Sequence, residues 1–289
     1  IPCYGIEPTE SAAKVAESRG IELIRDFFCR KLANLLADAG RKVDLAIANN
    51  VLAHVPDIND FVFAFTKILK PQGVATFENP HLLKLVEENQ FDTVYHEHFS
   101  YLSLTSVNTV FKKNGLTIFD VEQLPVHGGS LRYYAQRSDT GKRPITKNVE
   151  LMLQKENDSG LKTPAYYERF QIQAEIIKND FLTFLRDQKN KGKLVIGYGA
   201  AAKANTLLNF CGAQQELLTC IVDKNPTKQG MCCPGSKIPI VGEKILREKK
   251  PDMIVIFPWN IKEEIEEQLK YVREWGCKFS VAVPSLNIF

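Results

Sequence analysis

The chain has 289 residues, of which 44% are hydrophobic and 25% charged, the profile of a globular protein with room for one large or two ordinary domains. Its 37 basic and 34 acidic residues are well mixed and leave a formal net charge of +3, so neither nucleic acid nor an anionic membrane is indicated as a partner. No apolar run reaches the roughly 18 residues of a membrane-spanning helix, and the start lacks the regions of a signal peptide, so a cytoplasmic location is expected.

Cysteine usage points to neither disulfides nor structural zinc. The seven cysteines are odd in number and include no CxxC pair. A disulfide framework or a zinc ribbon would require paired spacings. We therefore expect no metal site built from cysteine.

Strand and helix patterns alternate through the first half of the chain. Segments with strand patterns are 3–7, 21–28, 43–55 and 74–80. Segments with helical spacing are 8–20, closed by glycine, 58–73, with a Pro-Gly stop, and the start of 105–119, which ends in a further strand. Residues 121–138 predict two strands around a tight glycine turn, as at an antiparallel edge. This rhythm indicates an α/β fold with a mostly parallel sheet covered by helices.

The second half repeats the alternation after a polar stretch. Residues 138–165 indicate a linker or an exposed helical crossing, and an amphipathic helix is expected over about 166–190. Residues 193–210 then predict a strand, a glycine turn and a helix, and strand and helix patterns continue to the end. We predict one α/β domain over residues 1–137, a linker and long helix over 138–190, and a second α/β domain over 191–289.

Polar and aromatic residues gather where the first predicted strands end. Glu7 ends the first strand, where a carboxylate can accept hydrogen bonds from the ribose hydroxyls of a nucleoside cofactor. The other strand-end residues are Asp26, Phe27, Asn49, Asn50 and His54. Ligands of open α/β sheets bind along that edge, although each residue alone could be a helix cap or a core aromatic. The glycine-rich turn expected to precede Glu7 would belong to a strand before residue 1.

The segment "YHEHFSY" has the components of proton transfer. Tyr95, His96, Glu97 and His98 supply a phenol, two imidazoles and a carboxylate. Neighbouring residues of a regular strand point to opposite faces, so a shared pocket requires a loop here. A zinc site made by His96, His98 and His54 is a weaker alternative, as is a polar loop without chemistry.

The turn "GYGAAAKAN" resembles a dinucleotide-binding turn only in part. Ala202 stands where the third glycine or alanine would be, and Asp223 is a candidate for the acidic residue on the next strand, so NAD is conceivable. A simple tight turn is the alternative. Lys203 and Asn205 at the start of the helix offer a cation and donors suited to a diphosphate.

The segment "HGGSLR" predicts a flexible turn that carries polar side chains. His127, Ser130 and Arg132 could contact a ligand there. The alternative is a glycine hairpin with exposed polar residues.

Taken in order, these segments resemble the sugar C-methyltransferases that use S-adenosylmethionine and act on nucleotide-linked keto-deoxysugars. The resembling segments cover the chain nearly end to end: "GIEPTESAAKVA", "ANNVLAHVPDINDF", "FDTVYHEHFSYLSL", "LPVHGGSLR", "GYGAAAKANTLLNF", "VDKNPTKQG", "PGSKIPI" and "FPWNIKEEI". The family has a small zinc-binding domain, a Rossmann-type methyltransferase domain and a C-terminal α/β domain that helps to hold the sugar nucleotide. The resemblance implies that residues 1–137 are the second part, without its first strand and glycine motif, and that residues 191–289 are the third.

The resemblance also implies roles for individual residues. Glu7 would bind the cofactor ribose, Phe27 the adenine region, and Asn49 and Asn50 the wall near the methionine moiety. Asp26 is also expected to bind the cofactor. Those matching the catalytic constellation are His54, Tyr95, Glu97 and His98. Those expected to contact the sugar nucleotide are His127, Ser130, Arg132, Lys203, Asn205 and Asn260.

The implied chemistry needs a base. A proton on carbon next to a ketone is weakly acidic, so a base must remove it while donors stabilise the enolate. We predict His98 as that base, with Glu97 orienting it or raising its basicity, and Tyr95 or His54 hydrogen-bonding the enolate oxygen or sugar hydroxyls. A sulfonium already carries an activated methyl group, so the reaction requires no metal.

Two other functions remain open from the sequence. An NAD-dependent sugar-nucleotide oxidoreductase would use the "GYGAAAK" turn and Asp223 and would not respond to S-adenosylmethionine. A non-catalytic remnant would bind a thymidine diphospho-sugar without turnover.

Overall fold

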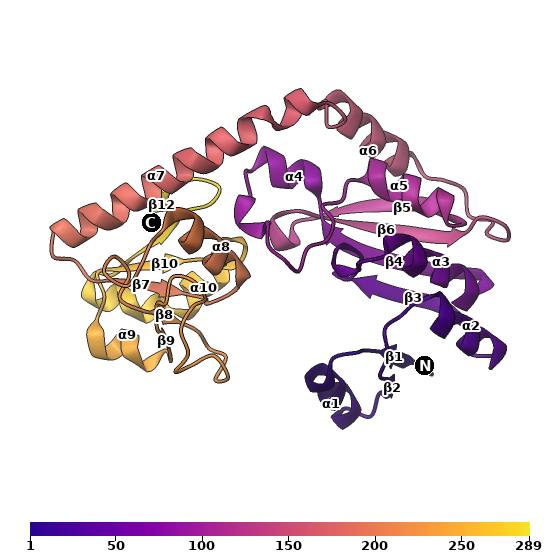
Figure 1. Ribbon diagram of the computed structural model, residues 1–289, viewed down its shortest axis with the longest axis horizontal. Coiled ribbons are helices and arrows are strands. Elements are labelled where there is room, and N and C mark those ends of the chain that lie inside the picture. The colour runs from indigo at the N-terminus through magenta and orange to yellow at the C-terminus, as the bar shows by residue number, and fades with distance from the viewer. The chain divides into compact units, whose positions relative to one another are not determined.

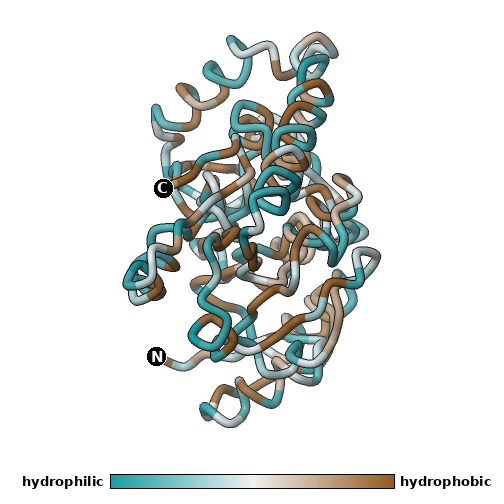
Figure 2. Tube along the Cα trace, turned by 90° about the vertical axis from the view of Figure 1, so that its left-hand side faces the viewer, coloured by the Kyte–Doolittle hydropathy of each residue, from teal (hydrophilic) through white to brown (hydrophobic).

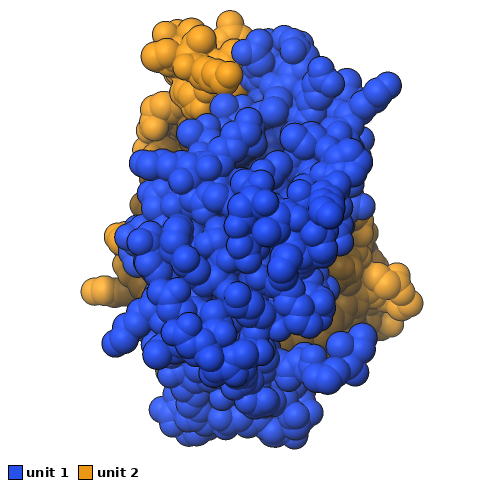
Figure 3. Space-filling view, turned by 90° about the vertical axis from the view of Figure 1, so that its right-hand side faces the viewer, with its two compact units in different colours: residues 1–81, 99–124, 130–159 blue, residues 82–98, 125–129, 160–289 orange.

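Two hydrophobic cores form in the chain, and each belongs to one of two units. The computed structural model describes residues 1–289. Unit 1 comprises residues 1–81, 99–124 and 130–159, and unit 2 comprises residues 82–98, 125–129 and 160–289 (Figure 3). The chain thus passes repeatedly from one unit to the other. The domain boundaries expected from the sequence, at residues 137 and 190, remain predictions.

Unit 1 contains two sheets and the helices that cover them (Figure 1). Its elements in chain order are β1 (Tyr4–Ile6), α1 (Glu10–Ser18), β2 (Glu22–Ile24), α2 (Arg30–Asp38), β3 (Val43–Asn49), the 3-10 turn η1 (Leu52–His54), α3 (Ile58–Ile68), β4 (Leu69–Pro80), α5 (Leu104–Lys113), β5 (Leu116–Leu124), β6 (Ser130–Arg137) and α6 (Lys147–Asp158).

The strand order of unit 1 is mixed. β1 and β2 pair in parallel as a separate two-stranded sheet, and the second sheet has the order β3-β4-β6-β5. β3 and β4 run parallel, whereas β6 runs antiparallel to β4 and, as the predicted glycine hairpin requires, to β5. The prediction of a mostly parallel sheet is therefore wrong for this sheet. Leu45 and Ile47, on one face of β3, are 52% and 66% exposed. The separation of β1 and β2 from the second sheet, which leaves β3 as an edge strand, was not predicted.

Aromatic residues build the core of unit 1. Phe65 of α3 lies 4.6 Å, between ring centroids, from Phe77 of β4, and Phe77 lies 4.8 Å from Phe111 of α5. All three are nearly inaccessible to solvent. Burial of such rings is the main stabilising contribution that joins these helices to the sheet.

The helix predicted from residue 58 to the stop at Pro71 is too long. α3 ends at Ile68, and Leu69 already has extended dihedral angles (φ −71°, ψ 136°). Lys70 precedes Pro71, and the residue before a proline is driven away from helical angles. β4 therefore starts five residues before the strand predicted at residue 74. The helix α2 was not predicted.

Unit 2 is built around one sheet covered by helices, with the long helix α7 along it (Figure 1). Its elements in chain order are α4 (Leu82–Glu87), η2 (Phe91–Thr93), η3 (Val126–Gly128), η4 (Pro164–Tyr167), α7 (Glu168–Asn190), β7 (Val195–Tyr198), α8 (Ala202–Cys211), β8 (Ile221–Val222), β9 (Ile240–Val241), α9 (Lys244–Lys249), β10 (Met253–Ile256), η5 (Trp259–Ile261), α10 (Lys262–Gln268), η6 (Lys270–Trp275), β11 (Lys278–Val281) and β12 (Asn287–Ile288).

The sheet of unit 2 has Rossmann topology. Its order is β12-β11-β10-β7-β8-β9, in which only β12 is antiparallel. The direction of the chain reverses between β7 and β10, the switch point at which doubly wound sheets bind ligands. The predicted fold class, a Rossmann-type domain followed by a second Rossmann-like α/β domain, is confirmed.

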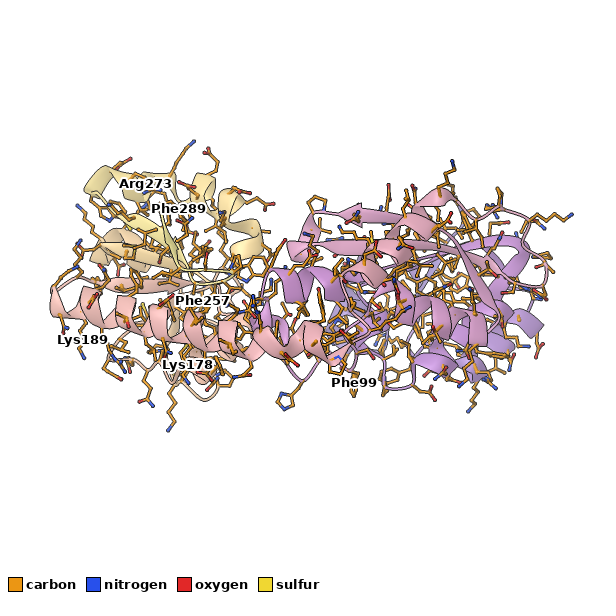
Figure 4. The ribbon with its side chains drawn as sticks, turned by 90° about the horizontal axis from the view of Figure 1, so that it is seen from above. Phe99, Lys178, Lys189, Phe257, Arg273 and Phe289 are labelled. Carbon is orange, nitrogen blue, oxygen red and sulfur yellow. The ribbon has the colours of Figure 1, made fainter.

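Close packing and alternating hydropathy explain this arrangement. Apolar and polar stretches alternate along the trace, as the β and α patterns require (Figure 2). Phe257 follows β10 inside unit 2 (Figure 4). It lies against Gly197, where an added Cβ would come within 2.7 Å of its ring. Near the last strand, Arg273 donates to the carbonyl oxygen of Phe289 at 3.0 Å.

No helix has the length and apolarity to cross a membrane.

Candidate functional site

The segment predicted to be catalytic lies in unit 2 and has no regular secondary structure, as expected from its sequence. Residues 94–98 follow the 3-10 turn η2. Nδ1 of His98 lies 2.8 Å from the carbonyl oxygen of Thr93. A carbonyl can only accept, so Nδ1 carries the proton in the neutral ring and Nε2 carries the basic lone pair. The loop therefore selects the tautomer that a general base at Nε2 needs.

Tyr95 and His98 pack against each other. Their ring centroids are 4.3 Å apart with an interplanar angle of 30°. Both side chains are half-buried, whereas His96 and Glu97 are exposed. The stacking fixes the imidazole from one side, and the Thr93 carbonyl fixes it along the ring edge.

A cavity of about 530 Å³ in unit 2 joins this loop to α8. Its lining residues are Val94, Tyr95, His96, Glu97, Ala202, Asn205, Thr206, Asn209 and Pro234. Oδ1 of Asn205 is buried and has no hydrogen-bond partner. The structure thus brings three predicted site residues, Tyr95, Glu97 and Asn205, to one cavity, with an acceptor on Asn205 that a donor on a ligand could satisfy.

Lys203 and Asn260, both predicted to contact the sugar nucleotide, contact each other. Nζ of Lys203 donates to Oδ1 of Asn260 at 2.7 Å and lies 4.0 Å from the Trp259 ring centroid. Nε1 of Trp259 donates to Oδ2 of Asp92 at 2.8 Å. Neither Lys203 nor Asn260 lines the cavity described above.

Burial governs the ionisation of this second cluster. Burial raises the pKa of Asp92 to about 6, although Lys203 and the Trp259 hydrogen bond oppose the rise. Burial likewise lowers the pKa of Lys203, and the Asp92 carboxylate opposes that shift. The negative charge of Asp92 and the positive charge of Lys203 therefore partly offset each other's cost of burial. Sequence patterns gave no indication of Asp92 or Trp259, because their contact joins residues 167 positions apart.

Asp223 is engaged inside its own unit. Its Oδ2 accepts from the backbone N–H of Ala200 at 2.9 Å and from Nζ of Lys228 at 3.3 Å, and its Oδ1 accepts from the N–H of Asn225 at 2.8 Å. A carboxylate that binds the glycine turn in this way has little capacity left for a ribose. The arrangement does not favour the NAD hypothesis.

The predicted cofactor residues lie at strand ends in unit 1. Glu7 follows β1 and Asp26 lies two residues beyond β2, and these two strands are parallel neighbours. Oε1 of Glu7 accepts from the N–H of Thr9 at 2.7 Å, and Asp26 accepts from the N–H of Phe27 at 2.7 Å. The ring of Phe27 is 72% exposed, which is unusual for a phenylalanine beside a sheet.

The end of β3 carries the other unit 1 candidates. Asn49 is its last residue, and Asn50 has a left-handed φ of 55° with its N–H bonded to the carbonyl of Glu78. Asparagine tolerates this conformation better than most residues. His54 ends η1 and is half-buried.

The predicted "HGGSLR" residues divide between the two units. His127 is exposed and belongs to unit 2, whereas Ser130 and Arg132 belong to unit 1, where Ser130 is buried. Nη2 of Arg132 lies 2.7 Å from Oε2 of the buried Glu78. Arg132 thus has an internal partner, and a role in substrate binding stays a prediction. No group of three or more His, Cys, Asp or Glu side chains has the arrangement of a metal site.

Several solved structures resemble this chain over less than half its length. A methyltransferase of Thermotoga maritima, described as a possible histamine N-methyltransferase, is 18% identical with a TM-score of 0.36 and covers 46% of this chain and 72% of its own. The N-methyltransferase NodS of Bradyrhizobium japonicum, solved with S-adenosyl-L-homocysteine, is 16% identical with a TM-score of 0.35 and covers 46% of this chain and 64% of its own.

Sequence relatives are more informative. The C-methyltransferase NovU of Streptomyces niveus is 34% identical over 286 residues, which are 98% of this chain and 67% of NovU. A family described as the C-methyltransferase C-terminal domain matches residues 125–284, and a methyltransferase domain matches residues 2–121. The chain belongs to the C-methyltransferase family. The predicted enzyme class, a methyltransferase with S-adenosylmethionine as its cofactor, is thereby confirmed.

Proposed function

We propose that this C-methyltransferase moves a methyl group from S-adenosylmethionine to carbon next to the ketone of a nucleotide-diphospho-deoxysugar, with C3 of a 4-keto sugar as the acceptor. The observation that carries the proposal is the His98 ring, whose Nδ1 bonds to the Thr93 carbonyl and leaves Nε2 as the basic nitrogen. The reaction needs a base of this kind, because the acceptor carbon must lose a proton before it becomes a nucleophile.

Unit 1 has the side chains to hold the methyl donor. Carboxylates at the ends of two adjacent parallel strands, Glu7 and Asp26, suit the ribose hydroxyls, and the exposed Phe27 ring suits the face of adenine. These residues fit the cofactor, with Asn49 and Asn50 assigned to its methionine end. S-adenosylmethionine supplies a methyl group on a sulfonium, which is already activated for transfer to carbon.

Unit 2 has the side chains to hold and deprotonate the acceptor. His98 would take the proton at Nε2, while the stacked Tyr95 keeps the imidazole oriented and Glu97 stabilises the imidazolium that forms. Asn205 lines the cavity with Tyr95 and Glu97, although His98 does not, and its amide would contact the acceptor. The first turn of α8 offers backbone N–H groups to a diphosphate, with Lys203 and Asn260 nearby on the same unit.

His98→Gln tests the proposed base. Glutamine keeps a polar side chain of similar reach but cannot take up a proton at neutral pH. We expect methyl transfer to a thymidine diphospho-4-keto-deoxysugar to fall by about 100-fold or more, the usual share of a general base. The same loss should appear in the exchange of the acceptor C–H proton with deuterium oxide, measured by NMR in the presence of S-adenosylhomocysteine.

The cofactor site supplies the internal control. Affinity for S-adenosylhomocysteine, measured by calorimetry, should stay at the parent value because its proposed contacts lie in unit 1. Parent rates of exchange and transfer in His98→Gln would refute the assignment of the base. No exchange by the parent protein would refute this class of acceptor.

A further inference from the structure

Asp92 is a buried acid that no step of the proposed reaction uses. It lies in η2, is 1% exposed, and accepts from Nε1 of Trp259 at 2.8 Å through Oδ2. Its Oδ1 is buried without a hydrogen-bond partner. A carboxylate held in this way is costly to bury, so a structural gain or a functional gain must offset the cost.

The residue next to Asp92 orients the proposed base. Thr93 provides the carbonyl that accepts from Nδ1 of His98. Thr93 itself is held within η2, since its N–H and Oγ1 both donate to the carbonyl of Gln90, at 3.1 and 2.7 Å. The position of the Thr93 carbonyl, and with it the direction of the His98 ring, therefore depends on how firmly η2 is held.

Trp259 ties η2 to the switch-point strand of unit 2. It lies in η5, three residues after β10, and its ring is 8% exposed. Gly128 is in close contact with the ring, since an added Cβ would lie 2.4 Å from it. Nζ of Lys203 also contacts the ring and lies 4.0 Å from its centroid. The indole thus has little freedom to move, and its N–H holds Asp92 at a fixed point.

We propose that Asp92 is a positioning residue for the methyl transfer, which holds the Thr93 carbonyl, and through it the His98 imidazole, by the hydrogen bond from Trp259. The inference rests on the proposed function, because it gives His98 the role of base. Asp92 touches neither substrate nor cofactor in this account. Its effect is on the rate of proton removal and not on the affinity for the acceptor.

Removal of either end of the bond should have the same effect. Asp92→Ala and Trp259→Phe both delete the contact, so we expect each to lower the rate of deuterium exchange into a thymidine diphospho-4-keto-deoxysugar by about 10- to 100-fold, the size expected for a misdirected catalytic group. KM for the sugar nucleotide should stay near the parent value. The double variant should be no slower than the slower single variant, since both remove one interaction.

Two further variants separate positioning from general stability. Asp92→Asn keeps an oxygen that can accept from the indole, so it should exchange near the parent rate even if Asp92→Ala folds poorly. Trp275→Phe removes a comparable indole bond in the same unit, to the carbonyl of Pro251 at 3.1 Å, and should leave exchange unchanged. Thermal unfolding identifies the variants that are folded at the assay temperature.

The outcomes distinguish this inference from the proposed function. Parent rates in Trp259→Phe, additive losses in the double variant, or an equal loss in Trp275→Phe would each overturn the role of Asp92. An Asp92→Asn rate as low as that of Asp92→Ala would also overturn it, because the hydrogen bond would not be the cause. If the parent fails to exchange, or His98→Gln exchanges at the parent rate, the proposed function itself fails.

Discussion

Glu156 is the most deeply buried acid of unit 1, and its replacement by glutamine should destabilise that unit strongly. The side chain lies on α6 with 0% exposure. Its Oε1 accepts from Nε2 of His81 at 2.7 Å and from the N–H of Leu104 at 2.6 Å, and its Oε2 accepts from the N–H of Thr105 at 2.8 Å. The carboxylate therefore caps the N-terminus of α5 and binds the residue that follows β4.

The size of the stability loss in Glu156→Gln follows from the hydrogen-bond donors that the substitution leaves without an acceptor. A glutamine oxygen can serve only one side, so its NH₂ group would face either Thr105 or the His81 and Leu104 donors. Loss of charge-assisted bonds together with an unsatisfied buried N–H should cost about 3 kcal/mol. Glu150→Gln, an exposed acid on the same helix, is the matched control and should change stability by roughly 0.5 kcal/mol or less.

The effect should depend on pH. Burial opposes the ionisation of Glu156, but the bonds from His81 and from the amides of Thr105 and Leu104 outweigh it and lower the pKa below its usual 4.5. A carboxyl group with a lowered folded-state pKa stabilises the fold above its unfolded pKa and loses that contribution as the pH falls through the folded value. The difference between parent and Glu156→Gln should thus be complete at pH 7 and shrink below pH 4.5.

Amide hydrogen exchange at Leu104 and Thr105 is the assay, because it reports the opening of α5 without interference from unit 2. Faster exchange in Glu156→Gln than in Glu150→Gln at pH 7 is expected. Equal exchange in the two variants, or a difference that grows in acid, would refute the reasoning.

Two further predictions concern the cofactor and the Trp259 contact. Glu7→Gln should weaken the binding of S-adenosylhomocysteine about tenfold or more in calorimetry, the loss expected for a charged hydrogen bond. The control variant Glu10→Gln, at an exposed position, should bind like the parent. Equal affinities in the two variants would show that Glu7 does not contact the cofactor. Gly128→Ala combines a φ of +83° with a Cβ 2.4 Å from the Trp259 ring, whereas Gly212→Ala has a φ of +67° but open space around the Cβ. The first variant should therefore lose roughly 1–3 kcal/mol more free energy of unfolding than the second. Equal losses would show that the Trp259 ring moves away at little cost.

Local pattern predicted most elements, including those that carry the proposed site residues. The strand ends at Glu7 and Asn49 and the irregular loop at Tyr95 to His98 lie where the alternation of strand and helix placed them. These features are determined by residues that are adjacent in the sequence, so a sequence pattern can predict them. The stop at Pro71 was also predicted, and because a proline restricts the residue before it, the helix ends slightly earlier, at Ile68.

Long-range pairing could not be predicted. Residues 82–98 belong to unit 2 although they follow a strand of unit 1, because η2 packs against α8 and Asp92 bonds to Trp259. No local signal reports such a contact. The same holds for the hydrogen bonds that Asp223 accepts from Ala200 and Lys228, which occupy the carboxylate that a ribose of NAD would need.

The central claim is carbon methylation of a keto-sugar nucleotide, and the most direct test follows the methyl group itself. The chain would be incubated with S-adenosylmethionine carrying a ¹³C-labelled methyl group and a thymidine diphospho-4-keto-deoxysugar, and the product examined by NMR. We predict that the labelled methyl group will be bonded to the carbon next to the ketone. A labelled methyl group on oxygen, or no product although S-adenosylhomocysteine binds, would contradict the account.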